Sequence, residues 1–391
     1  MNETPIPYWM AFAHAKNFSN KRKMDFLIEV VYNRKPIEEV FRKIKSGDKM
    51  GFEFTEKEWE GLLEAITEVP NNSFLAEKLL DQGIEIVNVM EQYAYPKILK
   101  ENLKKDAPIV IYIKGNADLL NKNSIAIVGS RNCSKRALDF TDNVAKKAVA
   151  QKSVIVSGFA KGVDKQALDS ALKFNGQSII VLPQGIETFN NKSYYAAIVR
   201  GDVLVISTYH PKTPWSVGLA MDRNKIIYGM AKEIFVAESG DSGGTWEGVL
   251  NGIKRGRQIF IRFASNDEKN ANNLLIKKGA IPVDMTGKII ELEKMSQLTV
   301  NEPEIQYQEL EINKFSDKQI VEKVIQELTL RKIKGITVNE IIELFSLKKK
   351  DSTRINKLLS KHPDLTKTKK GRVNCFLLKN QLPQQTSLIY E

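Results

Sequence analysis

The spacing of apolar residues divides the chain into regions with different predicted structures. From about residue 8 to residue 80, apolar clusters alternate with charged residues at helical spacing, as in "EKEWEGLLEAI", and Pro36 stands where a new helix could begin. These residues are predicted to form a small helical module.

A different pattern begins near residue 108, where short runs rich in β-branched residues show little polar alternation. Strands that are apolar on both faces belong in a covered, parallel sheet. Segments of helical periodicity lie between most of the runs, so the repeating unit is strand, helix, strand. The predicted fold class is α/β, an extended Rossmann-like, doubly wound parallel sheet that closes near Val283. The predicted strands lie in "APIVIYIKG", "SIAIVGS", "SVIVSG", "SIIVLPQG", "DVLVIST", "EIFVAES" and "QIFIRF".

The last part of the chain shows a third pattern. A polar stretch with a local acidic excess and no sustained period, "SQLTVNEPEIQYQELEINK", indicates a linker. Three helical stretches and two possible strands joined at Lys370-Gly371 follow it, which is typical of a winged helix. The predicted domains are a helical module (1–78), a Rossmann-like core (79–290), a linker (291–314) and a winged helix (315–380).

The charge of the chain adds a class of partner to this picture. The 391 residues include 59 Lys and Arg against 47 Asp and Glu, a formal net charge of +12, which favours an anionic partner such as nucleic acid, a nucleotide or an acidic membrane surface. Cys133 and Cys375 lie far apart with no His or Cys at metal-ligand spacing, so neither a disulfide framework nor a zinc site is expected. The sequence indicates no leader segment and no apolar run near the ~18 residues of a membrane span, and a cytoplasmic protein is predicted.

Glycine-containing loops at the ends of the predicted strands carry the candidate chemistry. Ligands collect at the carboxyl ends of parallel strands, where backbone N–H groups and helix N-termini attract anions. The first loop, Gly129-Ser130-Arg131, offers a hydroxyl and a guanidinium suited to phosphate, although a tight turn with an exposed arginine is an alternative. The second loop contains Ser157, Gly158 and Lys161, whereas the nearby Asp164 fits a helix cap or a first-turn acid.

Two more segments have the same character. Arg223, Asn224 and Lys225 precede an apolar stretch, and cations at a helix start suggest a bound anion, with a solvated face as the alternative. The loop "SGDSGGTWEG", which contains Ser242 and Gly243, is of a size suited to phosphate.

Together these segments predict a basic groove along one rim of the sheet, formed by Arg131, Lys161, Arg223 and Lys225. No loop has the G-x-G-x-x-G pattern with an acid about twenty residues further on, so a dinucleotide is disfavoured and no cofactor is predicted.

At residues 75 to 265 the chain resembles the DNA-processing protein A family, DprA or Smf. Members carry a strand followed by GSR, a segment SG-x-A-x-G-[IV]-D and a basic R-N-[RK]-I stretch. Here these are residues 129–131, 157–164 and 223–226, in the family's order and spacing.

The resemblance implies single-stranded DNA binding, a homodimer, and loading of RecA recombinase in natural transformation and recombination, by binding rather than catalysis. It also implies an N-terminal module of SAM or helix-hairpin-helix type, here in degenerate form, and a C-terminal winged helix. The predicted DNA or phosphate contacts are Gly129, Ser130, Arg131, Ser157, Gly158, Lys161, Arg223, Asn224, Lys225, Ser242 and Gly243.

Two other functions stay open. Related Rossmann-like proteins that sense nucleotides or hydrolyse N-glycosidic bonds use a P-G-G-x-G-T-x-x-E loop, which "SGGTWEG" superficially matches. Glu247 follows Thr245 by two positions rather than three, so on a helix its side chain would be misplaced by about a hundred degrees. The other function is that of a defence-associated paralogue whose winged helix binds DNA in a regulatory role. The predicted DNA contacts of the winged helix are Arg354, Lys357, Lys369, Lys370 and Arg372.

Overall fold

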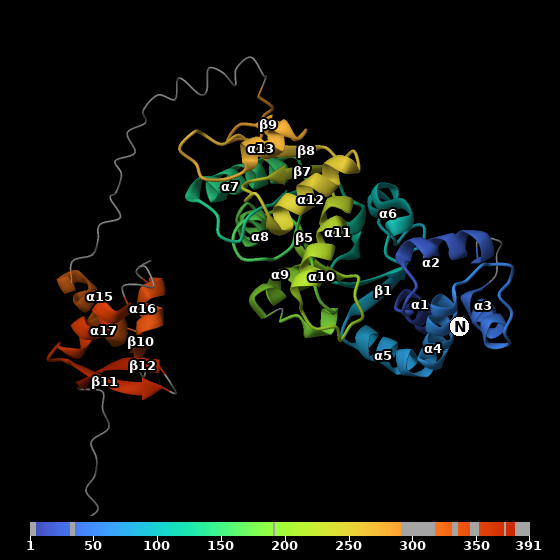
Figure 1. Cartoon of the computed structure of the whole chain (residues 1–391), viewed down its shortest axis with the longest axis horizontal. Coiled ribbons are helices and arrows are strands. Elements are labelled where there is room, and N and C mark those ends of the chain that lie inside the picture. Colours follow the sequence, from blue (N-terminus) through green and yellow to red (C-terminus); the bar gives the residue numbers. More distant parts are fainter. Residues whose placement is uncertain are drawn as a thin grey trace, which may run out of the picture. The chain divides into compact units, whose positions relative to one another are not determined.

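The computed structural model describes residues 5–31, 36–190, 192–290, 317–330, 335–344, 352–370 and 373–379, and Figure 1 shows their helices and strands. The chain divides into two compact units, Met1–Asn301 and Glu302–Glu391, each with its own hydrophobic core. Among the described residues, every helix lacks the length and apolar character needed to span a bilayer.

The first unit begins with the helical region that the sequence predicts. Thr55 starts α4 with a capping box, in which its hydroxyl accepts from the Glu58 N–H and the Glu58 carboxylate accepts from the Thr55 N–H. Pro36 directly precedes α3. Aromatic rings fill the core, and those of Phe12 and Phe26 lie 5.8 Å apart. The elements are α1 (Ile6–Ala13), α2 (Asn20–Phe26), the π-helix η1 (Leu27–Val31), α3 (Ile37–Lys45), α4 (Glu56–Thr67) and α5 (Val69–Asp81).

A nine-stranded sheet follows, in the order β1-β2-β6-β5-β4-β3-β7-β8-β9, and all neighbours from β6 to β9 pair in parallel. Each of the seven predicted runs forms a strand, β2 to β8, and the α/β fold class is confirmed. The strands are β1 (Ile84–Asn88), β2 (Val110–Lys114), β3 (Ser124–Val128), β4 (Val154–Ser157), β5 (Ser178–Val181), β6 (Val203–Ser207), β7 (Glu233–Val236), β8 (Ile259–Arg262) and β9 (Ile281–Val283).

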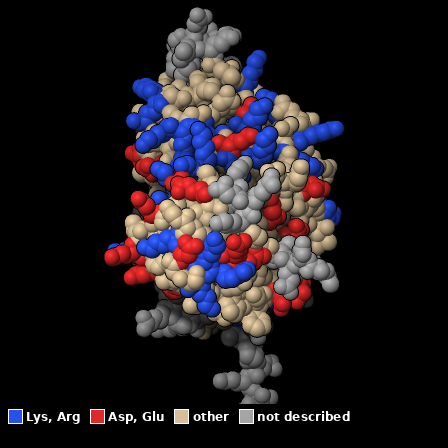
Figure 2. Space-filling view, turned by 90° about the vertical axis from the view of Figure 1, so that its right-hand side faces the viewer, with Lys and Arg blue, Asp and Glu red and all other residues tan. Residues whose placement is uncertain are grey.

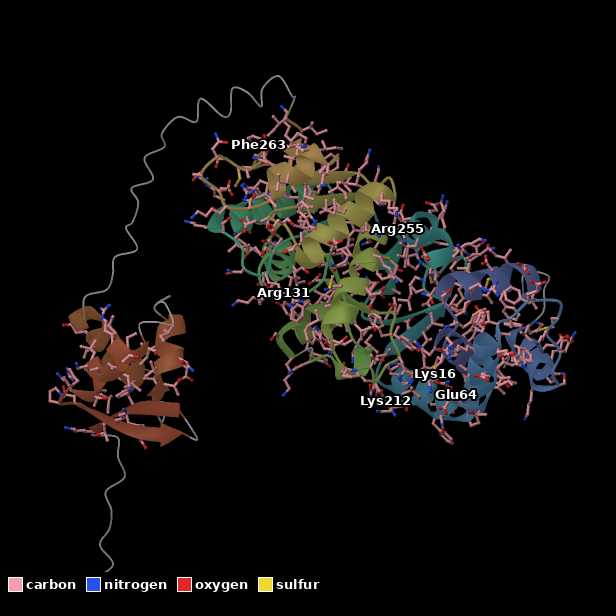
Figure 3. The ribbon with its side chains drawn as sticks, viewed as in Figure 1. Lys16, Glu64, Arg131, Lys212, Arg255 and Phe263 are labelled. Atoms are coloured by element: carbon pink, nitrogen blue, oxygen red, sulfur yellow. The ribbon has the colours of Figure 1, made fainter. Side chains whose placement is uncertain are left out.

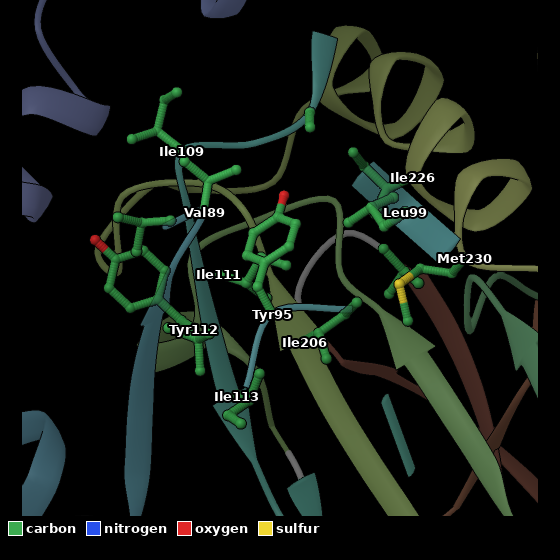
Figure 4. Close-up of a cluster of buried hydrophobic side chains, with 14 of the residues drawn as sticks. Val89, Tyr95, Leu99, Ile109, Ile111, Tyr112, Ile113, Ile206, Ile226 and Met230 are labelled. Atoms are coloured by element: carbon green, nitrogen blue, oxygen red, sulfur yellow. The ribbon is translucent and has the colours of Figure 1, made fainter. Parts of the chain in front are cut away.

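The prediction of parallel pairing is wrong for β2, which pairs antiparallel with both β1 and β6. Its residues are apolar on both faces because both faces are covered by protein. On one side Tyr112 is hydrogen-bonded to His14, next to the end of α1. Ile111 points to the other side, toward Tyr95 and Leu99 (Figure 4). An apolar pattern therefore reports that a strand is covered, and it does not report the direction of its neighbours.

Helices cover both faces of the parallel part of the sheet. On one face α7 and α8 pack against each other, and Phe140 joins the core there. On the other face, Ile226 of α11 and Val249 of α12 join the main core. The remaining elements of this unit are α6 (Lys97–Leu103), η2 (Lys104–Asp106), η3 (Ala117–Asn121), α7 (Lys135–Ala150), α8 (Val163–Lys173), η4 (Ile186–Thr188), η5 (Lys192–Tyr194), α9 (Tyr195–Arg200), α10 (Val217–Asp222), α11 (Asn224–Gly229), α12 (Gly243–Lys254) and α13 (Asn272–Lys277).

The second unit is a small helical domain with an antiparallel sheet in the order β10-β12-β11. Ile341, Leu359 and Phe376 are buried in its core. The two predicted strands are present as β11 and β12, and β10 is an additional one. The winged-helix assignment stays a prediction, and the predicted linker, 291–314, lies outside the described residues. The elements are α15 (Asp317–Leu330), β10 (Ile336–Thr337), α16 (Val338–Leu344), α17 (Ser352–Ser360), β11 (Leu365–Lys370) and β12 (Val373–Leu378).

Candidate nucleic-acid interface

The loops that follow β3, β4 and β7 come together at the carboxyl ends of these strands. With the junction of α10 and α11 they surround a cleft of about 440 Å³, here named the first groove. All four segments selected from the sequence contribute to its lining. The residues from these segments are Gly129, Ser130, Arg131, Ala160, Asp164, Arg223, Asn224, Gly240, Ser242, Gly243, Gly244 and Thr245, and Val217, Met221 and Tyr228 are among the others.

Arg131 is the exposed cation of the first groove (Figure 3). Its loop is held in place because the Ser130 N–H donates to the carbonyl oxygen of Glu238 at 2.8 Å. Gly129 is required by packing, since a Cβ there would lie 2.6 Å from Cγ2 of Val163. Within the described residues Arg131 has no hydrogen-bond or ion-pair partner, so its guanidinium is available to a phosphate.

The loop after β4 supports the first groove from beneath. Ser157 is buried, and its hydroxyl donates to the Ile127 carbonyl at 2.8 Å. Gly162 has φ +87°, and a Cβ there would lie 2.4 Å from the carbonyl oxygen of Ser130, so glycine is what lets the two loops touch. Lys161 is exposed and does not line the groove. A DNA contact by Ser157 or Lys161 stays a prediction.

Arg223 is buried, with 3% of its surface exposed. Its Nη1 donates to the Val181 carbonyl at 2.8 Å. Gly158 leaves room for the guanidinium, because a Cβ there would lie 1.8 Å from Nη1. Among the described residues, the Nε of Arg223 has no hydrogen-bond partner. Burial lowers the pKa of Arg223, so an anion in the groove would favour its charged form.

Asp164 is buried next to the same groove, in the first turn of α8, which is one of the two positions that the sequence predicts for it. Burial raises the pKa of its carboxyl, while the charge of Arg223 and the backbone N–H groups of Ala160, Gly129 and Gly158 act to lower it. The carboxylate therefore holds the two glycine loops against one another from inside the protein.

Tyr228 is a buried polar residue that the sequence does not indicate, because it stands in the apolar run "IIYGM" and looks like core. It is 5% exposed and lines the first groove, and its hydroxyl has no hydrogen-bond partner in the part of the chain that the structure describes. Arg223 and Tyr228 thus line the groove, and each has one buried polar atom, Nε and Oη, without a partner among the described residues. Because buried polar groups are normally paired, this indicates a polar ligand.

Glu238 occupies the position where a Rossmann-like fold usually binds an anion, the N-terminus of the helix after the first parallel strand. Its carboxylate accepts from the N–H of Ser134 at 3.2 Å and from the Ser134 hydroxyl. The buried Arg262 lies 3.8 Å away. The N-terminus of α7 is therefore already occupied by a carboxylate of the chain itself. Only the position of Glu238 at a strand end could have signalled it in the sequence.

The remaining predicted contacts lie at the edge of the first groove or beyond it. Asn224 Nδ2 donates to the Gly244 carbonyl at 3.1 Å, which ties α11 to the start of α12. Lys225 forms an ion pair of 2.6 Å with Asp222 and lines a neighbouring cleft. Ser242 directly precedes α12, which begins at Gly243, so part of the predicted loop is helical.

Three large apolar side chains are exposed around the start of α10. Trp215 is 48% exposed, Val217 59% and Met221 44%, and the last two line the first groove. Flat or apolar surfaces beside a cationic groove are suited to stacking of bases.

In the second unit, Arg354 and Lys357 are exposed on α17. Lys369 and Lys370 belong to β11, and Arg372 lies outside the described residues. In the part of the chain that the structure describes, no three His, Cys, Asp or Glu side chains gather to hold a metal ion.

Comparison with known proteins finds one family model and several relatives that are similar to the chain. The family model for DNA recombination-mediator protein A matches residues 86–294, more than half of the chain. The DNA processing protein DprA of Streptococcus pneumoniae is 35% identical over 158 residues, covering 40% of this chain and 55% of that protein. Protein Smf of Escherichia coli is 28% identical over 195 residues, covering 48% and 51%. The chain thus matches about half of the length of these curated relatives.

The fold is also similar to a solved structure. The X-ray structure of DprA from Streptococcus pneumoniae superimposes with a TM-score of 0.56 at 25% sequence identity, covering 72% of this chain and 95% of that chain. The region matched by the family model, residues 86–294, contains every residue that lines the first groove.

Proposed function

The chain belongs to the DNA recombination-mediator protein A family, and on this premise we propose that it binds single-stranded DNA in the first groove. The observation that carries the proposal is that Arg223 and Tyr228, which line the groove together with the exposed Arg131, each keep a buried polar atom that has no partner among the described residues. A phosphodiester supplies the acceptors that these donors lack.

Each part of the groove has a proposed task in binding the strand. Arg131 contacts a phosphate by charge and by its planar set of donors, and the glycine loops let the backbone come close. Bases stack against Met221, which lines the groove, and against Trp215 outside it, and both side chains are exposed in this structure. Because phosphate contacts and stacking carry little sequence information, affinity should depend weakly on base composition.

Glu238 supports DNA over a free nucleotide as the ligand. A nucleotide diphosphate in a Rossmann-like fold uses the helix N-terminus, and in this chain that position is filled by the Glu238 carboxylate. The donors left open, on Arg131, Arg223 and Tyr228, lie along the groove instead.

The wider role follows from the family. We propose that the chain protects single-stranded DNA and loads RecA recombinase onto it, as a cytoplasmic homodimer and without catalysing a reaction. The family's description as a recombination mediator supports this role. We propose that this activity serves DNA uptake in natural transformation and DNA recombination. A role in defence is the alternative.

The second unit has a proposed role of its own. We propose that residues 315–380 form a winged helix, joined by a linker at 291–314, and that Arg354, Lys357, Lys369, Lys370 and Arg372 contact DNA phosphates. The exposure of Arg354 and Lys357 on α17 supports this assignment.

The proposal is tested by binding of a fluorescent single strand over a salt series to the wild type and to Arg131→Ala, with Arg42→Ala as the control. Arg42 is an exposed arginine on α3, far from the first groove in the sequence and absent from its lining. For each phosphate contacted, the logarithm of the association constant falls by about 0.7 per decade of salt. Arg131→Ala should bind roughly tenfold more weakly and lose about one such increment of slope, because it loses one charged contact.

The proposal is contradicted if the wild type does not bind the strand, or if Arg131→Ala and Arg42→Ala behave alike at every salt concentration. A titration with ADP in parallel identifies the alternative, since a chain that binds ADP and ignores DNA would be a nucleotide-binding protein.

A further inference from the structure

A second cleft of about 420 Å³ lies between α6, α11 and α12 and is here named the second groove. It shares four lining residues with the first groove: Met221, Asn224, Tyr228 and Gly244. The hydrogen bond from Asn224 to the Gly244 carbonyl lies where the two grooves meet. The two clefts are therefore adjacent, with these residues between them.

The lining of the second groove has an excess of positive charge. Its cations are Lys225, Lys254, Arg255 and Arg257, and its acids are Asp222 and Glu247. Lys225 pairs with Asp222 and Arg255 pairs with Asp106, whereas Lys254 is exposed and has no ion-pair partner among the described residues. Figure 3 shows the two ends of this path, with Arg131 in the first groove and Arg255 beside α6 in the second.

Two residues of the second groove each have a buried polar atom without a partner in the described part of the chain. One atom is the hydroxyl of Tyr228, a residue that lines both grooves. The other is the Nε of Arg257, whose Nη1 donates to Asn102 and whose Nη2 donates to the Ala231 carbonyl. Buried donors in a basic cleft call for a ligand rich in acceptors, such as a phosphodiester.

The surface next to the second groove is also basic. Figure 2 views the first unit from the side of its helical region and shows Lys and Arg side chains gathered in the upper part, the side of α2 and α6. Lys104 and Lys105, in η2 directly after α6, are exposed. A chain of phosphates that leaves the second groove past α6 would thus stay in a positive field.

We propose that the second groove holds the continuation of the same single strand, with Lys225 and Lys254 each contacting a phosphate and the Tyr228 hydroxyl donating to the phosphate at the junction. This inference rests on the proposed function of the first groove. It reassigns Lys225 from the first groove to the second, and it makes Tyr228 the residue common to both.

The test compares a short strand of about 4 nucleotides with a long one of about 16, the range of site sizes for single-strand binding folds. The variant is Lys225→Ala with Lys254→Ala, and the matched control is Lys57→Ala with Lys277→Ala, two exposed lysines that line neither groove. The wild type should bind the long strand more tightly than the short one. The groove variant should lose about tenfold affinity and about 1.4 of salt slope on the long strand only.

The outcomes separate the two proposals. If the wild type binds neither strand, the proposed function itself fails. If it binds both strands equally tightly per site, or if the groove variant matches the control on the long strand, the first groove stands and the second is not a DNA site. Equal losses on both strands would also overturn the inference, because they would place the two lysines at the first groove.

Discussion

Two buried tyrosines differ in what their hydroxyls meet. The hydroxyl oxygen of Tyr112, in β2 beneath the helical region, lies 2.9 Å from Nε2 of His14, and the two groups are hydrogen-bonded. The hydroxyl of Tyr228, which lines both grooves, has no partner among the described residues. Two buried cations differ in part: the Lys23 ammonium donates to the Ala13 carbonyl at 2.6 Å, whereas Arg223 donates to the Val181 carbonyl through Nη1 and leaves its Nε without a partner in the described residues.

The contrast separates polar groups that stabilise the fold from polar groups that are available to a ligand. A buried hydrogen-bonded pair stabilises the folded state, whereas an unpartnered buried group costs about 1–3 kcal/mol. A protein that keeps two such groups in one cleft gives up stability there, which is typical of binding sites. Changes around Tyr112 should therefore alter stability, and changes around Tyr228 should alter binding.

The largest expected effect is the pH dependence of stability contributed by His14. Burial, aided by the charges of His210 and Lys23, lowers the pKa of His14 from 6.5 to about 3. Between these values the unfolded chain binds a proton that the folded chain does not, so the free energy of unfolding should fall as the pH falls from 6.5 to 3, by about a few kcal/mol. Urea unfolding over this pH range measures it.

Other groups titrate in the same range, so the informative quantity is the difference between variants. His14→Gln should flatten the profile relative to the wild type, while His362→Gln, in the second unit, should leave the profile of the first unit unchanged. DNA affinity should be the same in both variants. A profile for His14→Gln as steep as that of the wild type would contradict the assignment.

The next effect concerns Gly158, which is in contact with the Arg223 guanidinium. In Gly158→Ala the new Cβ would lie 1.8 Å from Nη1, so the guanidinium must move and its bond to the Val181 carbonyl is lost. Overpacking of this kind costs about 1–3 kcal/mol of stability. DNA affinity should fall by about tenfold, because one displaced charged hydrogen bond is worth about 1.5–3 kcal/mol.

Gly218→Ala is the matched control, because Gly218 lies in the adjacent α10, where a new Cβ would meet only the Ser216 hydroxyl, at 4.0 Å. It should bind DNA like the wild type and be slightly more stable, as expected for alanine in a helix. Equal DNA binding by the two alanine variants would show that Arg223 plays no part in the groove.

The sequence could predict those features of the fold whose residue pattern lies within a short stretch of the chain. The seven strands β2 to β8 and the glycine loop 129–131 were predictable because their patterns lie within a few residues. The antiparallel pairing of β2 was not, since coverage by a distant helical region produces the same apolar run as parallel pairing.

The candidate site shows the same limit. Arg223 and Lys225 stand two positions apart and look alike in the sequence, yet the first is buried under one groove and the second lines another. Tyr228 was missed because the sequence does not show what surrounds its hydroxyl, and without that information a tyrosine in an apolar run looks like a core residue. Glu238 was missed because its partner, Ser134, is 104 residues away in the chain.

A smaller effect is expected at Glu238. This residue differs from the paired and the unpartnered polar groups compared above, because its carboxylate fills a position where an anion could bind. Glu238→Gln removes a carboxylate from the N-terminus of α7 and should lower stability by about 1 kcal/mol, because the helix end favours negative charge. With the negative charge removed, this helix end should then bind inorganic pyrophosphate, measured by calorimetry. Glu233→Gln, at the start of β7, is the control and should bind none. If Glu238→Gln gains no pyrophosphate binding, the carboxylate does not exclude nucleotides.

The smallest effect is the most direct test of the contrast between the two tyrosines, because both substitutions remove one oxygen. Tyr112→Phe breaks the hydrogen bond to His14 and should lower the free energy of unfolding by about 1 kcal/mol, with DNA affinity unchanged. Tyr228→Phe removes a hydroxyl that has no partner, so stability should stay the same or rise by up to about 1 kcal/mol. Its affinity for single-stranded DNA should fall by roughly two- to tenfold, the worth of one hydrogen bond. Thermal unfolding and fluorescence titration measure both. If Tyr228→Phe instead loses stability and keeps its affinity, its hydroxyl is a structural group like that of Tyr112, and the junction of the two grooves is not a binding site.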